Sequence, residues 1–238
     1  ADTWKDGTVS YLKMMYPRLA LMRELLSDKG SIYVHIDWHV GHYVKILLDE
    51  VFGKENLRNE IIWHFQAGTA PLTDFARKHH NIFRYSKGKE VFFKQMRVPV
   101  KDESIYPFTN EDGRKYRMSG NNNATRYYAD EGSKMDDVWS WRDDKDVRIT
   151  QVYPAMPEYL EYQTQKPEKL LERIINSSCS EGGLVADFFS GSGTAGVVAE
   201  RLGRKWIMSD LGKPACLITR KRLIDQNAKP FLYQAVGD

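Results

Sequence analysis

Three glycines in the last quarter of the chain have the spacing of a nucleotide-binding turn. Residues 184–189 form a short apolar run, which predicts a strand buried on both faces, and Gly191-x-Gly193-x-x-Gly196 follows it directly. Gly191 and Gly193 let the backbone turn tightly and let a ligand approach closely. Residues 194–202 then have helical composition, and the amides at that helix start favour a polar or anionic ligand group.

An acid in the expected place supports this interpretation. Asp210 follows the next predicted strand, residues 205–209, where the dinucleotide fingerprint requires a carboxylate for the ribose. A tight strand-to-helix turn without any ligand would show the same glycines. An oxidoreductase that binds a nicotinamide dinucleotide is a second alternative, although neither a second glycine-rich half nor a hydride-transfer base is apparent.

The composition is that of a soluble globular protein with a locally basic face. The length of 238 residues suits one domain, or one domain with a large insertion, and the contents of hydrophobic and charged residues, 42% and 28%, are ordinary. The net charge of +3 is weak evidence for a polyanionic partner. Residues 77–97 carry seven basic side chains against the single acid Glu90. Such a face can track phosphates, although a solvated charged surface explains it as well.

The sequence gives no sign of a metal site, a membrane span or a secretory signal. Cys179 and Cys216 lack metal-ligand spacing and are most simply small packing residues. No apolar run is long enough to cross a bilayer, and no signal peptide is visible. We therefore predict a cytoplasmic protein in a reducing compartment, without a bound metal and without a membrane partner.

The first part of the chain predicts helices and strands in alternation. Apolar spacing indicates helices over residues 11–26 and 43–52, the first of them kinked or started late by Pro17. Strands are predicted over four segments, the last two joined as a hairpin through Gly88: residues 31–36, 60–66, 81–85 and 90–94. His35 and Asp37 close the first strand, where ligands bind in open α/β sheets, so Asp37 is a possible site residue. A capping Asp and a packed His explain this pair equally well.

Residues 95–157 differ from the rest and read as an insertion that recognises the substrate. The stretch is polar, shows no helical period and contains aromatic side chains that could stack on bases or form a small core, namely Tyr127, Tyr128, Trp139 and Trp141. Beyond it we predict helices over residues 167–176 and 214–227 and a last strand over residues 231–234.

Several motifs in a fixed order resemble a known family. Thr164-Gln165-Lys166-Pro167, then Asp187-Phe188-Phe189-Ser190-Gly191-Ser192-Gly193-Thr194, then Asp210 resemble the amino-group DNA methyltransferases. More narrowly, they are similar to the β class, in which the catalytic region precedes the cofactor region. Residues 11–19 and 30–37 also look like the helix and strand that follow that family's catalytic motif. Nearly the whole chain is covered, and residues 95–157 match only as the variable target-recognition region.

This resemblance implies S-adenosylmethionine as the cofactor. Phe188 and the amides of residues 190–194 would wrap its methionine end, Asp187 would lie near its ammonium group, and Asp210 would accept hydrogen bonds from both ribose hydroxyls. Residues 164–167 would close the other side of the pocket. The predicted cofactor-binding residues are Thr164, Gln165, Lys166, Pro167, Asp187, Phe188, Ser190, Gly191, Ser192, Gly193, Thr194, Asp210 and Leu211.

The implied fold is α/β: a doubly wound, mostly parallel, Rossmann-like methyltransferase sheet with an inserted target-recognition region. Residues 1–94 would form the catalytic side of the domain, residues 95–157 the insertion and residues 158–238 the S-adenosylmethionine-binding part.

One motif of that family is missing from the chain. The catalytic sequence Asp/Asn/Ser-Pro-Pro-Tyr/Phe holds the target amine and stacks the flipped base, and it should lie shortly before the helix that starts near Tyr11. The chain contains no Pro-Pro pair, so we assign no catalytic residue. The same motif ends the central strand of the sheet. Its absence suggests a fragment or a processed form, and we expect another chain or another copy to fill the gap.

The function predicted from the resemblance is site-specific DNA methylation, as in restriction-modification, in a prokaryote or phage. A methyl group would pass from S-adenosylmethionine to an exocyclic amine, with N6 of adenine favoured over N4 of cytosine, on a base flipped out of double-stranded DNA. The predicted DNA contacts are His79, Arg84, Lys87, Arg126 and Trp139, and loss of Arg84 or Lys87 should reduce the salt dependence of binding. An incomplete module that only binds DNA or S-adenosylmethionine is the alternative.

Overall fold

The chain forms two compact units. The computed structural model describes residues 7–66, 70–100, 102–120, 125–141 and 149–237. One unit comprises Ala1–Phe93 with Asp137–Asp238, and the other is Lys94–Asp136. The second unit is shorter than the expected insertion of residues 95–157, because strand β9 (Val138–Ser140) returns to a sheet of the first unit.

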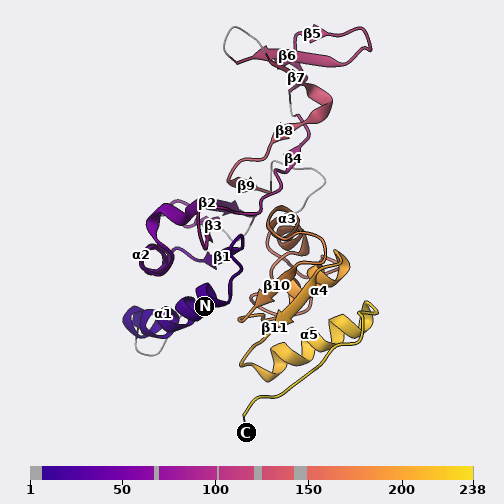
Figure 1. Cartoon of the computed structure of the whole chain (residues 1–238). Helices are drawn as coiled ribbons and strands as arrows, with labels where there is room; N and C mark the ends of the chain where they lie inside the picture. Colours follow the sequence, from indigo (N-terminus) through magenta and orange to yellow (C-terminus); the bar gives the residue numbers. More distant parts are fainter. Residues whose placement is uncertain (1–6, 67–69, 101, 121–124, 142–148, 238) are drawn as a thin grey trace. The chain divides into compact units, whose positions relative to one another are not determined.

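The first unit contains a mixed four-stranded sheet in the order β1-β3-β2-β9 (Figure 1). Strand β3 (His79–Ser86) lies between β1 (Ser31–Ile36) and β2 (Leu57–His64) and is antiparallel to both, whereas β2 and β9 are parallel. The predicted hairpin of residues 81–85 and 90–94 is therefore wrong. Strand β3 pairs with β1 on one edge and with β2 on the other, so no edge of β3 is free for residues 90–94. These residues form no strand.

Two helices cover one face of this sheet. Helix α1 (Gly7–Leu25) and helix α2 (Gly41–Phe52) pack their apolar stripes against β1 and β3 in one core. Its fully buried members include Leu19, Leu48 and Tyr85. Helix α1 begins ten residues before Pro17, so the expected late start is wrong. A short 3-10 helix, Lys54–Asn56, joins α2 to β2.

A second, two-stranded sheet carries the glycine turn. Strand β10 (Leu184–Asp187) pairs in parallel with β11 (Lys205–Met208), and helix α4 (Thr194–Arg201) is the crossover between them. Helix α3 (Glu168–Ser178) precedes β10 and helix α5 (Lys213–Asp225) follows β11. One face packs on α3 and α4, but Leu184 and Ile207 on the other face remain 57% and 52% exposed. The prediction that this strand is covered on both faces is therefore wrong for the described part of the chain.

The two sheets are not joined by strand pairing. Among the described strands, β1 is paired only with β3, and β10 only with β11. Side chains connect the sheets instead, since the Tyr33 hydroxyl on β1 lies 2.7 Å from Ser178 Oγ at the end of α3. Strands β1 and β10 thus each keep one edge that no other described strand pairs with.

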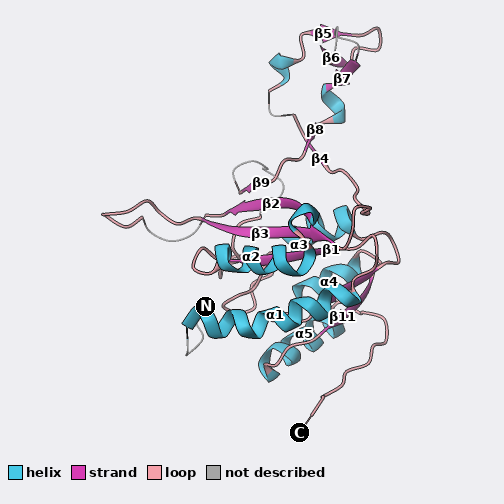
Figure 2. Ribbon diagram, turned by 60° about the vertical axis from the view of Figure 1, so that its left-hand side comes forward, coloured by secondary structure: helices cyan, strands magenta, loops and turns pink. Residues whose placement is uncertain are grey.

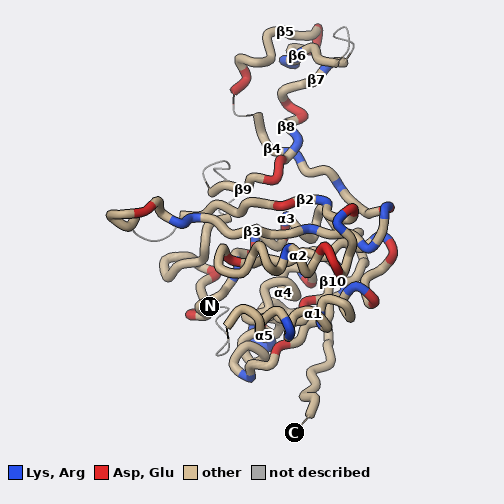
Figure 3. Tube along the Cα trace, turned by 90° about the vertical axis from the view of Figure 1, so that its left-hand side faces the viewer, with Lys and Arg blue, Asp and Glu red and all other residues tan. Residues whose placement is uncertain are grey.

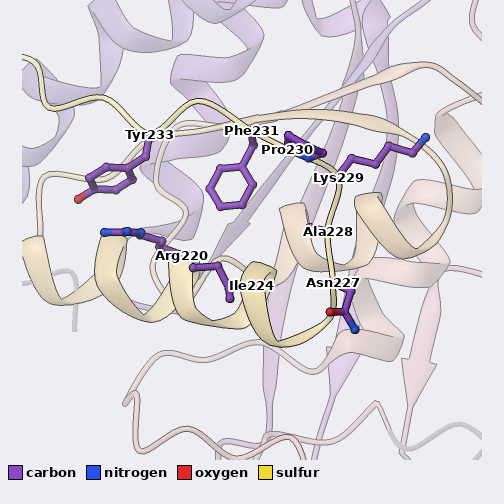
Figure 4. Close-up of a pocket in the computed structure, with 8 residues that line it drawn as sticks. All are labelled: Arg220, Ile224, Asn227, Ala228, Lys229, Pro230, Phe231 and Tyr233. Carbon is purple, nitrogen blue, oxygen red and sulfur yellow. The ribbon is translucent and has the colours of Figure 1, made fainter.

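The end of the chain folds back along α5. Residues 231–234 form no strand, contrary to the prediction, and Phe231 instead packs on Trp206 with ring centroids 5.4 Å apart. Figure 4 shows Phe231 and Tyr233 beside Arg220 and Ile224, where they line a small pocket. None of the residues that line this pocket belongs to the predicted cofactor set.

The second unit is built from short antiparallel strands. Strands β5 (Phe108–Thr109), β6 (Lys115–Ser119) and β7 (Thr125–Tyr128) form a three-stranded sheet, and β4 (Arg97–Val98) pairs with β8 (Ser133–Lys134). Among the described residues of this unit, the 3-10 helices Glu103–Ile105 and Ala129–Glu131 lie between these strands. Across both units, no helix that the structure describes has the length and apolarity needed to span a bilayer.

Candidate cofactor site

The predicted glycine turn lies at the carboxyl end of β10. The chain leaves the strand at Asp187, turns through residues 188–193 and enters α4 at Thr194, with Gly193 in the left-handed conformation (φ 74°) as the N-cap. Gly193 N donates to Ser190 O over 2.7 Å, which closes the turn. The turn therefore presents the helix start at the sheet edge where ligands bind in α/β folds.

Each of the three glycines meets a different constraint. Gly191 and Gly193 have positive φ, which side-chain-bearing residues adopt only with strain. A Cβ at Gly193 would also overlap the Thr219 side chain on α5, with Thr219 Cβ only 2.8 Å away. A Cβ at Gly196 would overlap Met208, so that glycine lets α4 approach β11 closely.

Two carboxylates flank the turn. Asp210 follows β11, and its two oxygens accept hydrogen bonds from Gly191 N and Gly212 N, both over 2.8 Å. Asp187 ends β10 and accepts from Phe189 N over 3.1 Å. Burial raises the pKa of Asp187, which the Phe189 amide and Lys166 partly offset. Beside Asp210, the Leu211 side chain is wholly exposed.

The segment 164–167 touches the turn from the side of α3. Thr194 Oγ1 donates to Lys166 O over 3.3 Å, and Pro167 is the N-cap of α3. Gln165 is buried and its amide bonds the residues just before the segment, because its Oε1 accepts from Leu160 N over 3.0 Å. Its side chain is therefore not open to a ligand.

An arginine that the sequence analysis missed fixes the helix start. Arg222 on α5 donates to Ser192 O over 2.9 Å and to Thr194 Oγ1 over 3.1 Å, and it pairs with Glu168 on α3 over 2.7 Å. Arg201 on α4 pairs with the same Glu168. This network joins the three helices around the turn. Only the position of Arg222 within the predicted helix of residues 214–227 hinted at it, and charge spacing alone does not separate it from a surface arginine.

A histidine pair lies at the neighbouring end of β1. His35 Nε2 and His80 Nδ1 are 2.9 Å apart, in contact with the Trp63 ring. Burial lowers the pKa of His35 well below its usual value, and the Lys166 charge lowers it further. The same two causes lower the pKa of His80. The charge of Lys166 thus acts on both histidines and on Asp187, and the carbonyl oxygen of this lysine accepts from Thr194 at the glycine turn.

Asp37, the possible site residue, caps the turn after β1. Its Oδ1 accepts from His39 N over 2.9 Å and its Oδ2 lies 3.2 Å from His39 Nδ1. The negative charge of Asp37 also raises the pKa of His80, which opposes the larger lowering by burial and by Lys166. Asp37 thus has the capping role in the structure, and its charge also acts on one histidine of the pair.

We expect the histidine pair to make the protein less stable in acid. A histidine whose pKa is lowered by folding is protonated first in the unfolded chain, so the free energy of unfolding falls as pH drops through about 6.5. The slope is up to about 1.4 kcal/mol per pH unit for each proton. Urea unfolding between pH 8 and 5.5 measures it. The variant His35→Gln should flatten the slope, whereas His42→Gln, at an exposed position, should not. An unchanged slope in His35→Gln would contradict the assignment.

The geometry argues against three of the five predicted DNA contacts. Arg84 is 4% exposed, lies 4.2 Å from the Phe93 ring centroid and bonds Ser31 Oγ. Lys87 Nζ donates to two carbonyls at the end of α1, and Trp139 is 7% exposed beneath Arg173. Arg84 and Trp139 therefore pack inside the protein, and Lys87 caps the end of α1. We no longer expect substitution of Arg84 or Lys87 to change the salt dependence of DNA binding.

The other two predicted contacts, His79 and Arg126, are exposed. Arg126 lies over the Tyr116 ring, 5.1 Å from its centroid, and no acidic side chain in the described residues pairs with it. The described part of the chain holds no group of three or more metal-binding side chains.

Comparisons with known proteins agree with this architecture. The family model described as DNA methylase, of the N6/N4 type, matches residues 3–221. Type II methyltransferase M.EcaI of Enterobacter cloacae is 29% identical over 90% of this chain and 57% of its own length. DNA adenine methyltransferase YhdJ of Escherichia coli K12 is 24% identical over 93% of this chain and 69% of its own.

A solved structure shows the same fold. PvuII DNA methyltransferase, described as cytosine-N4-specific, matches 93% of this chain and 73% of its own with a TM-score of 0.63 at 15% identity. The chain spans about half the length of several curated relatives it matches. Because the family model covers nearly every residue, the chain belongs to the S-adenosylmethionine-dependent DNA methylase family, whose members modify N6 of adenine or N4 of cytosine.

Proposed function

We propose that this chain is the cofactor-binding and DNA-recognition part of a methyltransferase that modifies N6 of adenine in DNA. The observation that carries the proposal is the glycine turn held between two carboxylates, with Gly191 N bonded to Asp210 and Asp187 at the end of β10. Such a turn offers donors for an anion, an acceptor for an ammonium group and a carboxylate for a diol.

The donor set fits S-adenosylmethionine part by part. Asp187 would face the ammonium group, and the start of α4 would face the carboxylate of the methionine end. Each Asp210 oxygen has lone pairs beyond the one its backbone amide uses, so it can also accept from the ribose. Exposed Leu211 and half-buried Phe188 would supply apolar surface for the adenine ring. A dinucleotide fits the glycines equally well, and the family match is what favours S-adenosylmethionine.

The chemistry would be a direct displacement in which the chain's own residues position the reactants. When bound, the cofactor supplies a methyl group on a sulfonium, ready for attack by an amine. Asp187, the turn and Asp210 would hold it in one orientation. The Pro-Pro motif that orients the amine is not in this sequence. We propose that it comes from outside residues 1–238, on a strand that pairs with a free edge of β1 or β10.

The DNA would be held through basic and aromatic side chains. In the second unit Arg117 and Arg126 stack on Tyr127 and Tyr116, and neither has an acidic partner among the described residues. Arginine in this setting can contact phosphates or base edges. In the first unit His79 stays among the proposed contacts.

Adenine is the proposed base, and cytosine is the second candidate. The match to an enzyme described as DNA adenine methyltransferase over 93% of this chain favours adenine. The family itself includes both N6 and N4 modification.

The test is methyl transfer by the complete gene product that contains this chain. Plasmid DNA is incubated with S-adenosylmethionine, digested to nucleosides and analysed by mass spectrometry, while calorimetry measures cofactor affinity. We expect N6-methyladenine and micromolar or tighter cofactor binding, with NAD unable to compete. N4-methylcytosine would establish the second candidate. Cofactor binding without transfer would indicate a binding module, and binding of NAD in its place would overturn the proposal.

A further inference from the structure

The loop that joins β2 to β3 carries two large apolar side chains without any cover. Leu72 is 104% exposed and Phe75 is 98% exposed. In Figures 2 and 3 the part of this loop that the structure describes, residues 70–78, extends beyond the ends of both strands. Among the described residues, the other large apolar side chains at least 80% exposed are Leu211, beside Asp210, and Leu232 and Val236, in the C-terminal tail. Single exposed apolar residues are common on protein surfaces. Exposure alone therefore does not indicate a function for Leu72 and Phe75, and their position in the fold has to be considered.

The base of the loop lies at the end of the four-stranded sheet that carries the histidine pair. His64 and His79 face each other where the loop leaves β2 and enters β3. The next pair in the ladder is Trp63 with His80, and His80 Nδ1 lies 2.9 Å from His35 Nε2 on β1. The carbonyl oxygen of Lys166 accepts from Thr194 Oγ1 at the glycine turn, and the charge of the same lysine acts on both histidines. The loop therefore projects from the end of the sheet at which β1 and β2 finish, and ligands of α/β sheets bind outside the carboxyl ends of strands.

The charges near the loop suit a polyanion. Arg77 lies 4.4 Å from the Trp38 ring centroid, and Lys78 and His79 follow it at the start of β3. In residues 65–79 the one acid is Asp74, whose carboxylate accepts from Thr73 Oγ1 over 3.4 Å. Figure 3 shows the basic residues near the strands and the acid further out. An apolar tip above a basic stem is the pattern of side chains that enter a base stack while cations contact the neighbouring phosphates.

We propose that Leu72 and Phe75 form a wedge that enters duplex DNA at the target and occupies the gap left by the extruded base. This inference rests on the proposed function, because only chemistry on a base requires extrusion. Arg77 and Lys78 would contact phosphates on either side. The wedge acts on the base-pair opening step and leaves the cofactor site untouched.

The first measurement maps base opening without methyl transfer. The complete gene product is bound to plasmid DNA, and chloroacetaldehyde, which modifies unpaired adenine and cytosine, reports open bases. The wild type should create discrete reactive positions, and Leu72→Ala combined with Phe75→Ala should reduce them at least tenfold. Leu232→Ala, which removes a similarly exposed side chain from the tail, is the matched control. A wild type that opens no base would overturn the wedge.

The second measurement asks whether opening is the step that the wedge supports. Single-turnover methylation is compared on a paired duplex and on one with a mismatch at the target, where the base is already unpaired. The double variant should lose 10- to 100-fold on the paired duplex and stay within threefold of wild type on the mismatch. An equal loss on both, or no loss, would overturn the wedge, as would a lowered melting temperature, which would show that the side chains pack against protein. Absent methylation with base opening retained would count against the proposed function alone.

Discussion

Replacing Asp210 by Asn should weaken S-adenosylmethionine binding by at least 100-fold, the largest effect we expect from one side chain at the site. Asp210 accepts from Gly191 N and Gly212 N through different oxygens. An amide keeps one acceptor and turns an N–H group toward the other backbone donor, so the turn itself shifts. The ribose loses a charged acceptor as well. A 100-fold loss corresponds to about 2.7 kcal/mol, within the range for hydrogen bonds to a charged group with one partner left unsatisfied.

Calorimetric titration with S-adenosylmethionine measures this loss. Asp225→Asn is the control, because it removes an exposed carboxylate of α5 whose partner is Lys221, away from the turn. The control should bind like the wild type. If Asp210→Asn bound within threefold of wild type, Asp210 would be a structural acceptor for the turn, and the ribose would have to be held elsewhere.

The cofactor side of the molecule was predictable because its signals are local. The apolar run, the glycines and the later acid each act within a few residues, and the structure places β10, the turn, α4 and β11 in that order. Backbone conformation explains this success: positive φ at Gly191 and Gly193 is a property that only a few residue types permit. The identity of the ligand, in contrast, came from the resemblance and the family match.

The catalytic side was less predictable because its arrangement depends on pairing over long distances. Strand β3 pairs with β1 and β2, which composition does not reveal, and so the prediction that residues 90–94 pair with it is wrong. Arg84 looked like a phosphate contact within a basic run, yet strand alternation turns its side chain into the sheet beneath Phe93. The same run places Arg77 at the loop. Counting charges along the sequence does not distinguish buried Arg84 from exposed Arg77. The pairing register of β3 does distinguish them, because it fixes which side chains of the strand point into the protein.

Replacing Gly193 by Ala should destabilise the fold by about 2–4 kcal/mol and abolish cofactor binding with it. The residue has φ 74°, which costs Ala about 1 kcal/mol or more. The added Cβ would overlap Thr219 on α5, and relieving such an overlap by backbone shifts typically costs about 1–3 kcal/mol. Thermal unfolding and cofactor titration both report the change. Gly203→Ala is a matched control for the first cost alone, since it also has positive φ but would meet no atom within 4 Å.

A second substitution separates the two costs at Gly193. Thr219→Ala removes the overlapping Oγ1 and Cγ2 atoms and, by itself, loses only the weak bond from Thr219 Oγ1 to Gly191 O over 3.3 Å. In the double variant the two closest overlaps disappear, so its loss of stability relative to Thr219→Ala should be clearly smaller than the loss that Gly193→Ala causes in the wild type. The strain of the left-handed backbone and the approach of the Thr219 Cβ to 2.8 Å then remain. If the two substitutions simply added, α5 would not be what fixes the turn, and the contact between Arg222 and Ser192 O would have to hold the helix start alone.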